Sequence, residues 1–299
     1  MRDLKTKGER EEEEEEEKEE KEGFQGTSLE PRQLSAAEAE KLASERVTLS
    51  DFHRAKLERD AQRNWDVFYK RNEARFFRDR HWTGREFSAF LPSERALTLL
   101  EVGCGAGNFL FPLLASHPRL RVLACDFSPR AVALVQKDPR FEATRCEAFV
   151  CDVASPGSLA GREGCADVAS LVFVLSAVHP DKMGAALAQV ARTLVPGGHL
   201  LVRDYGLHDH AQLRFGRGAK LGERFYARQD GTRSFFFELE EMRALLAGAG
   251  LEVLSCQFVL RRTVNLKEEV SVPRVFVQAV ARKLCSVDSP RPDDEKAPR

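Results

Sequence analysis

The segment LTLLEVGCGAGNFLF, from Leu97 to Phe111, decides the fold of this protein. An apolar run typical of a strand enters a turn with glycines at positions 103, 105 and 107, and a segment of helical pattern follows. Glycine lets the backbone turn tightly and approach a ligand without a Cβ atom in the way. Such a turn can hold a dinucleotide or a smaller adenosine-containing cofactor.

Strands and helices alternate along the chain from Leu97 onward. Strands are predicted at residues 97–103, 121–128, 148–154, 167–178, 199–206, 251–259 and 273–284. Helical segments separate most of them. This alternation predicts an α/β, Rossmann-like sheet of seven strands with helices on both faces. We expect this domain to span residues 97–283.

Two helices are predicted before the domain, in an extension that spans residues 34–96. The first covers residues 34–46, where Ser35 and Glu38 have the spacing of a capping box. The second covers residues 50–72 and carries apolar residues at helical spacing.

Both ends of the chain are predicted to be disordered tails, at residues 1–33 and 284–299. Residues 1–22 hold 12 acidic and 6 basic residues, so they repel themselves and cannot bury apolar area. The rest of the chain keeps 35 acidic and 40 basic residues, a formal charge of +5. The composition fits a solvated spacer, and competition with nucleic acid for the basic body is the alternative.

The spacing of the glycines does not match the dinucleotide fingerprint. G-x-G-x-x-G needs glycine at its sixth position, where Asn108 stands when the count begins at Gly103. Asp126 ends the next predicted strand and can accept hydrogen bonds from ribose hydroxyls. Asp152, in the strand after that, can accept from an adenine amino group. Because parallel sheets bind ligands at the carboxyl ends of their strands, the three features together indicate an S-adenosylmethionine site.

Several other features limit the class of protein. No apolar run reaches the roughly 18 residues that cross a membrane, and the acidic N-terminus lacks a signal-peptide core. The seven cysteines show no CxxC spacing, which favours buried, reduced thiols in the cytoplasm, or also in the nucleus. His208 and His210 lie two residues apart without a carboxylate cluster, so we expect no metal.

Longer motifs extend over most of the chain. They are NWDVFYKRN, FFRDRHWTGREF, EVGCGAGN, CDFSPRAV, FVLSAVHPDKM, RDYGLHDHAQLRF and FYARQDGTRSFFF. These motifs resemble the tRNA N3-methylcytidine methyltransferases, which are class I S-adenosylmethionine-dependent enzymes, and most of all the member that acts on serine tRNAs. The resemblance covers residues 34–282. The glutamate run departs from the family pattern.

The resemblance implies a substrate, a partner and site residues. The implied product is N3-methylcytidine at position 32 of the anticodon loop of serine tRNAs, with seryl-tRNA synthetase as a partner. The expected cofactor-binding residues are Trp65, Tyr69, Gly103, Asp126, Asp152 and Val172. The expected RNA-binding residues are Arg80, His81, Arg203, Arg214, Lys220 and Arg228. On pattern alone, Trp65 and Tyr69 could instead be core aromatics of the helix they share.

The chemistry of cytosine suggests a role for Asp204. N3 has a lone pair that can attack a sulfonium methyl without a general base, and the product is a cation. A carboxylate near the ring would stabilise that charge, so Asp204, at the end of the predicted strand 199–206, is the catalytic candidate. A salt bridge between Asp204 and Arg203 is the alternative. Because N3 lies on the Watson–Crick edge, the base must be unpaired or flipped out.

Basic and aromatic residues alternate in two segments, 54–85 and 203–233. The first holds ten basic residues against five acids, with six aromatic residues among them. Cations contact phosphates and aromatic rings stack on unpaired bases, so the pattern favours an RNA substrate. Two alternatives stay open: a methyltransferase of the same fold that acts on another RNA, a small molecule or a protein, and an RNA-binding adaptor that has lost the cofactor.

Overall fold

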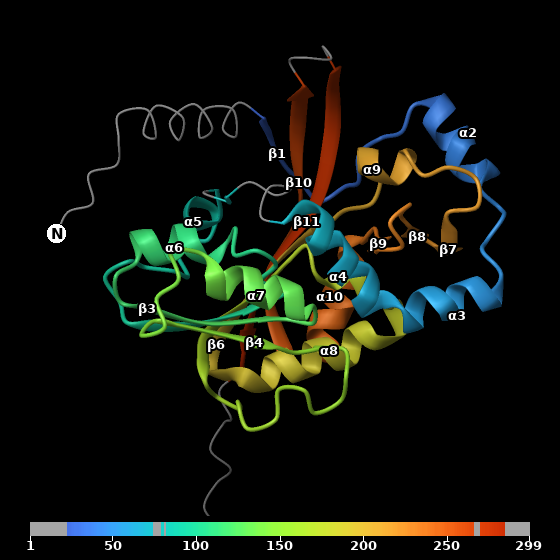
Figure 1. Ribbon diagram of the computed structural model, residues 1–299. Coiled ribbons are helices and arrows are strands. Elements are labelled where there is room, and N and C mark those ends of the chain that lie inside the picture. The colour runs from blue at the N-terminus through green and yellow to red at the C-terminus, as the bar shows by residue number, and fades with distance from the viewer. Residues whose placement is uncertain (1–22, 74–78, 81, 266–269, 285–299) are drawn as a thin grey trace, which may run out of the picture.

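A mixed eight-stranded sheet forms the centre of the protein in the computed structural model, which describes residues 23–73, 79–80, 82–265 and 270–284 (Figure 1). Its strands are β1 (Phe24–Ser28), β2 (Leu97–Val102), β3 (Leu120–Asp126), β4 (Cys146–Val150), β5 (Ala166–Val172), β6 (Leu194–Tyr205), β10 (Leu251–Asn265) and β11 (Val270–Lys283). Their order in the sheet is β1-β10-β11-β6-β5-β2-β3-β4. Strands β2 to β6 pair in parallel, whereas β11, β10 and β1 are antiparallel to their neighbours. The predicted α/β, Rossmann-like class is confirmed.

The helices cover both faces of this sheet. They are α2 (Ala36–Ser44), α3 (Asp51–Arg59), α4 (Ala61–Asn72), α5 (Trp82–Glu86), α6 (Leu110–Ser116), α7 (Pro129–Lys137), the 3₁₀ turn η1 (Leu175–Ala177), α8 (Pro180–Thr193), α9 (His210–Leu213) and α10 (Leu239–Gly248). Successive strand residues enter opposite cores: Leu99 packs with α6, and Leu100 packs in the cluster that holds α8 and α10. Among the described residues, no helix is long and apolar enough to cross a membrane.

The sheet has one strand more than the sequence predicted. β1 pairs antiparallel with β10, and Phe24 lies opposite Arg261. The prediction of a disordered tail is therefore wrong for Phe24–Ser28. This strand lacks an apolar alternation because both of its faces stay largely open, and it is held by main-chain pairing to the edge of β10. Residues 1–22 and 285–299 lie outside the described part of the chain.

The N-terminal helices follow the prediction in part. The capping box is confirmed, since Ser35 Oγ accepts from the Glu38 amide at 3.3 Å and the Glu38 carboxylate accepts from the Ser35 amide at 2.8 Å. The single helix predicted over residues 50–72 is wrong, because the chain leaves helical geometry at Asp60, with φ −92° and ψ 8°. The break lets α4 pack along α7 while α3 reaches toward α8.

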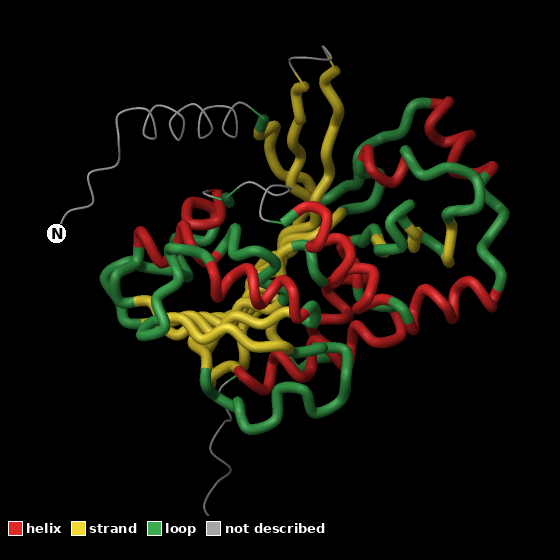
Figure 2. The backbone as a smooth tube through the Cα atoms, viewed as in Figure 1, coloured by secondary structure: helices red, strands yellow, loops and turns green. Residues whose placement is uncertain are grey.

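A small second sheet lies beyond the main one and was not predicted (Figure 2). It consists of the antiparallel strands β7 (Lys220–Gly222), β8 (Phe225–Ala227) and β9 (Arg233–Phe235). Aromatic side chains pack around this small sheet. Phe215, which precedes β7, stacks on Tyr226 of β8 with the ring centroids 4.6 Å apart. Asn64 of α4 donates to the Gly231 carbonyl at 2.9 Å, which joins this sheet to the N-terminal extension.

The cysteines behave as expected from their spacing. The six described cysteines are unpaired, and all but Cys165 are buried.

Two truncations test the assignment of β1. Removing residues 1–28 deletes the strand and leaves the edge of β10 without its partner, so we expect the free energy of unfolding to fall by about 1–3 kcal/mol. Removing residues 1–22 keeps β1 and should leave that free energy unchanged. Urea denaturation of the two truncated proteins and the full chain measures the difference. Equal stability of all three would show that β1 contributes nothing.

Candidate active site

Two cavities meet at the carboxyl ends of the parallel strands. The first has a volume of about 460 Å³ and the second about 350 Å³. The residues that line both are Trp65, Tyr69, Gly103, Phe173, Ala177 and Arg233. This edge of the sheet is where proteins of this architecture bind ligands.

The glycine turn after β2 forms the floor between the two cavities. Gly103 and Gly105 have φ values of +70° and +56°, which favour glycine. A Cβ atom at Gly103 would lie 2.4 Å from a methyl of Val174, and one at Gly105 would lie 2.8 Å from the Tyr69 hydroxyl. The turn is therefore pressed against both η1 and α4, and no larger residue fits at either position.

Asp126 ends β3 and lines the first cavity. Its carboxylate accepts hydrogen bonds from the Gly105 amide at 3.0 Å and the Ser128 amide at 2.9 Å. Burial raises the pKa of Asp126 to about 6 in spite of these bonds. A carboxylate has about four acceptor sites, so Asp126, which lines the first cavity, can still accept from a ligand hydroxyl.

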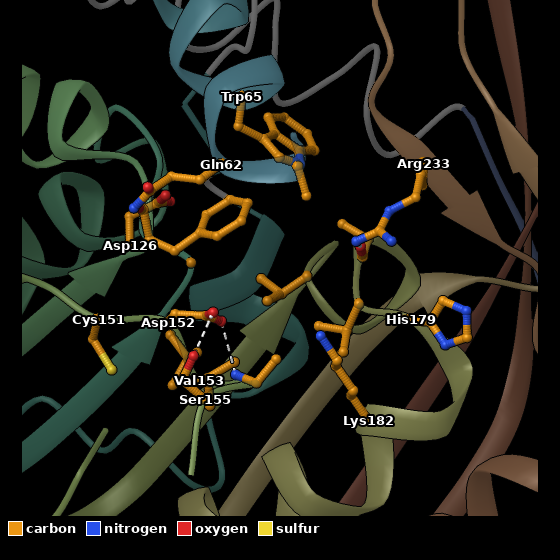
Figure 3. Close-up of a pocket in the computed structure, with 18 of the residues that line it drawn as sticks. Gln62, Trp65, Asp126, Cys151, Asp152, Val153, Ser155, His179, Lys182 and Arg233 are labelled. Atoms are coloured by element: carbon orange, nitrogen blue, oxygen red, sulfur yellow. Dashed lines mark hydrogen bonds between the residues drawn. The ribbon is translucent and has the colours of Figure 1, made fainter. Parts of the chain in front are cut away.

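Asp152 lies two residues beyond β4 and also lines the first cavity (Figure 3). Its carboxylate accepts from the Ala154 amide at 2.9 Å and the Ser155 hydroxyl at 2.7 Å, so it also caps its own turn. Val153 lines the same cavity and was missed, because a lone valine in an apolar run carries no sequence signal. Val172, by contrast, lines only the second cavity.

Helix α4 lies over the first cavity, and Trp65 projects from it toward the cavity (Figure 3). The rings of Trp65 and Tyr69 stack with their centroids 6.1 Å apart. Gln62, one turn earlier, donates to the Phe127 carbonyl at 2.6 Å. Both Trp65 and Tyr69 pack against neighbours and border the cavities, so the core interpretation and the cofactor interpretation fit the same geometry.

The end of α3 is tied to the opposite rim of the first cavity by an ion-pair cluster. Glu58 forms ion pairs with Lys182 of α8 and Arg233 of β9. These two cations hold the pKa of Glu58 below its usual range although burial opposes them. The cluster therefore ties α3 of the N-terminal extension to α8 and β9.

Arg203 is not an RNA-binding residue in this structure, and the prediction is wrong. Its side chain is 1% exposed, forms an ion pair with Glu86 at 2.5 Å, and lies 4.5 Å from the Trp82 ring centre. Burial lowers its pKa to about 10, while Glu86 favours the charged form. The alternative salt bridge with Asp204 is wrong too, because consecutive strand residues point to opposite faces.

The other expected RNA-binding residues do not lie together in the structure. Arg80 and Arg228 line the second cavity, where Arg80 donates to the Val172 carbonyl at 3.3 Å. Lys220 donates to the Glu45 carbonyl at 2.9 Å, and Arg214 is exposed. His81 lies outside the described residues. The predicted RNA-binding group is therefore divided between a cavity wall and the surface.

Asp204 is fully buried at the end of β6. Its carboxylate accepts from the Ser176 and Tyr205 amides, both at 2.9 Å, and burial raises its pKa to about 6. Ser176 and Tyr205 line the second cavity, whereas Asp204 itself has no exposed surface. Asp204 therefore makes no direct contact with a base in the second cavity, and the carboxylate predicted to lie near the ring is one residue behind the cavity wall.

Comparison with known proteins identifies the family. A profile described as a methyltransferase domain matches residues 100–200. The mouse protein named tRNA N(3)-cytidine methyltransferase METTL6 is 51% identical over 265 residues, which cover 87% of this chain and 94% of the mouse protein. The Schizosaccharomyces pombe protein named tRNA N(3)-methylcytidine methyltransferase trm141 is 40% identical, over 79% of this chain and 98% of its own. This chain belongs to the tRNA N(3)-cytidine methyltransferase family.

Solved structures agree on the architecture of this methyltransferase. A S-adenosylmethionine-dependent methyltransferase from Anabaena variabilis has a TM-score of 0.57 and 16% identity, and the match covers 74% of this chain and 94% of that one. The prediction of a S-adenosylmethionine-dependent enzyme is confirmed, and the cofactor-free adaptor is not supported. Within the described ranges, no three His, Cys, Asp or Glu side chains are placed to hold a metal ion.

The residues of the first cavity fit the methyltransferase cofactor. Asp126 can accept from ribose hydroxyls, Asp152 from the adenine amino group, and Trp65 can cover the ligand from α4. Glu101, two residues before Gly103, lines neither cavity, and its buried Oε2 has no hydrogen-bond partner. Burial raises the pKa of Glu101 to about 8, while the nearby Arg80 guanidinium opposes that shift. When bound, S-adenosylmethionine supplies an electrophilic methyl group.

Substitution of Asp126 tests this assignment. Asp126→Ala removes the acceptor for the ribose hydroxyls, so we expect cofactor affinity to weaken by about 1.5–3 kcal/mol in calorimetric titration. Asp181→Ala, which changes an exposed acid on α8, is the matched control and should bind normally. A folded Asp126→Ala protein with unchanged affinity would show that the ribose is held by other groups.

Proposed function

We propose that this enzyme methylates N3 of a cytidine in tRNA, and that the cytidine is position 32 of the anticodon loop of serine tRNAs. The names of the mouse and yeast relatives support the base and the atom. The resemblance to the member that acts on serine tRNAs supports the position, the tRNA species and seryl-tRNA synthetase as a partner. We also propose that the enzyme works in the cytoplasm and in the nucleus.

The second cavity is the observation that carries this proposal. It adjoins the cofactor cavity, and its wall combines rings with guanidinium groups, namely Phe173, Tyr205, Phe276, Arg80, Arg228 and Arg274. An unstacked base presents an apolar face and a polar edge, so rings and cations together suit it. The volume of about 350 Å³ leaves room for a base that has left its stack.

The methyl transfer depends on how the protein orients the base more than on proton transfer. N3 of cytosine attacks with its own lone pair, so the cavity has to hold the ring in line and exclude water. Positive charge then develops on the ring. Asp204 lies behind Ser176 and Tyr205, and a buried carboxylate acts over this distance because the protein interior screens it weakly.

Activity on total tRNA tests the proposed substrate. We expect mass-spectrometric nucleoside analysis to find new N3-methylcytidine, confined to position 32 of serine tRNAs, and we expect added seryl-tRNA synthetase to raise the rate. Methylation of other tRNAs to the same extent would overturn the serine specificity. If the synthetase does not change the rate, it is not a partner in the reaction. N3-methylcytidine formed in an RNA other than tRNA would favour the alternative substrate class.

Asp204→Asn tests the electrostatic role of the carboxylate. The change keeps the shape and removes the charge, so turnover should fall about tenfold to a thousandfold while cofactor affinity stays nearly constant. Asn also brings an amide N–H₂ where two backbone amides donate, so thermal stability is measured in parallel. A stable variant with normal turnover on bound tRNA would leave Asp204 a purely structural role.

The pH profile gives an independent reading of the same group. Because burial raises the pKa of Asp204 to about 6, the carboxylate is charged above that pH and neutral below it. Wild-type turnover should therefore fall as pH decreases through about 6. The Asp204→Asn protein should lose this dependence when cofactor is saturating, which separates Asp204 from Asp126. If turnover of the Asp204→Asn protein still falls as pH decreases through about 6, the group that titrates is not Asp204.

A further inference from the structure

Phe173 has an unusual backbone for an aromatic residue. It follows the last residue of β5 with a φ of +60°, a region where the Cβ atom of a large side chain is crowded. Three other described residues that are not glycine share a positive φ: Glu73, His208 and Arg224. Of the four, only Phe173 lines the two cavities. Such strain is costly, persists only where the surrounding structure holds it, and clusters at functional sites.

Neighbouring groups hold this strained residue firmly. The Phe173 amide donates to the Arg203 carbonyl at 2.8 Å, which extends the pairing of β5 with β6. The Phe173 ring lies 5.1 Å from the Tyr205 ring and 5.4 Å from the Phe276 ring. The Arg80 guanidinium lies 5.2 Å from the same ring. The conformation is therefore supported from several elements at once.

The Phe173 ring is only partly buried in the core. Phe173 packs against the buried cluster around β2 and α6 but stays only partly buried, and its open surface borders both cavities. A residue needed only to turn the chain at this φ would be glycine, which has no strain there. The sequence instead keeps a phenyl ring at the junction where cofactor and substrate must meet. The strain is offset by something that only the ring provides.

We propose that Phe173 is the surface on which the target cytosine stacks, so that the base is oriented toward the cofactor cavity. This inference rests on the proposed function, since it assigns a residue to the substrate of that same site. Stacking on an aromatic ring contributes about 1–3 kcal/mol per base. Arg228 and Arg274 lie 5.7 Å and 6.0 Å from the Tyr205 ring, on the side of the same cavity where they can meet the polar edge or the phosphate.

The backbone strain makes the test selective. Phe173→Gly deletes the ring and also relieves the strain, and this relief offsets part of the packing lost with the ring. Phe173→Leu keeps apolar volume but has no π-face. The thermal stability of both variants is measured beside the wild type. Loss of base binding in both variants, at preserved stability, cannot come from unfolding. Phe149→Leu on β4 removes a ring that lies outside both cavities and is the matched control.

The experiment uses the full-length enzyme and a serine anticodon stem-loop that carries fluorescent pyrrolocytosine at position 32. Binding to the wild type and to Phe149→Leu should quench the fluorescence, because the base stacks on a ring. Both Phe173 variants should bind without quenching. The wild type should also prefer the cytosine RNA over an abasic RNA by about 5-fold to 150-fold, and the Phe173 variants should lose that preference.

Three outcomes would overturn the inference. Normal quenching and normal preference for cytosine in the Phe173 variants would show that the base stacks elsewhere. Loss of cofactor affinity in calorimetry with an intact preference for cytosine would assign the ring to the cofactor. Full rates of N3-methylcytidine formation by both variants would remove its role in orientation. Failure of the proposed function differs from all three, because the wild-type enzyme itself would then form no N3-methylcytidine in tRNA.

Discussion

The close approach of the backbone at the glycine turn is the constraint on which the site depends. Gly103 and Gly105 leave no room for a Cβ atom, since Val174 and Tyr69 already occupy the space where one would lie. Because Gly105 contacts Tyr69, α4 packs against the end of β2. Because Gly103 contacts Val174, η1 lies beside the same turn. Three segments far apart in the sequence thereby meet, and the two cavities form between them. A larger residue at the turn would separate all three.

Buried charges organise the surroundings of the cavities in two different ways. Arg203 forms an ion pair with Glu86, and its guanidinium lies over the Trp82 ring, so its charge ties α5 to the main sheet. Asp204, its neighbour in β6, accepts hydrogen bonds from Ser176 and Tyr205 and lies behind the wall of the second cavity. The two residues are adjacent in sequence and face opposite sides of the sheet. Strand alternation alone separates a structural charge from one that can act on the substrate.

The N-terminal extension is part of the site and not an appendage. Trp65 and Tyr69 supply one wall of both cavities, and the ion pairs of Glu58 with Lys182 and Arg233 hold α3 to the body of the enzyme. Asn64 and Gln62 add hydrogen bonds to the second sheet and to the loop after β3. The enzyme can therefore enclose its ligands with residues that precede the Rossmann-like domain by many positions along the chain.

The sequence by itself determined the features that depend on local patterns. The alternation of strands and helices, the capping box at Ser35 and the acids at 126 and 152 could all be read from spacing, because periodicity and strand ends carry those signals. The cofactor class followed from the glycine spacing together with these acids. Only the tertiary structure decided that β1 joins the sheet, that the helix over residues 50–72 breaks at Asp60, and that Arg203 is buried. Each of these depends on a distant partner: the open edge of β10, the surface of α7 and the carboxylate of Glu86. The strained backbone of Phe173 likewise has no signature in sequence, because contacts from β6, β11 and Arg80 hold it, and such long-range contacts leave no local pattern.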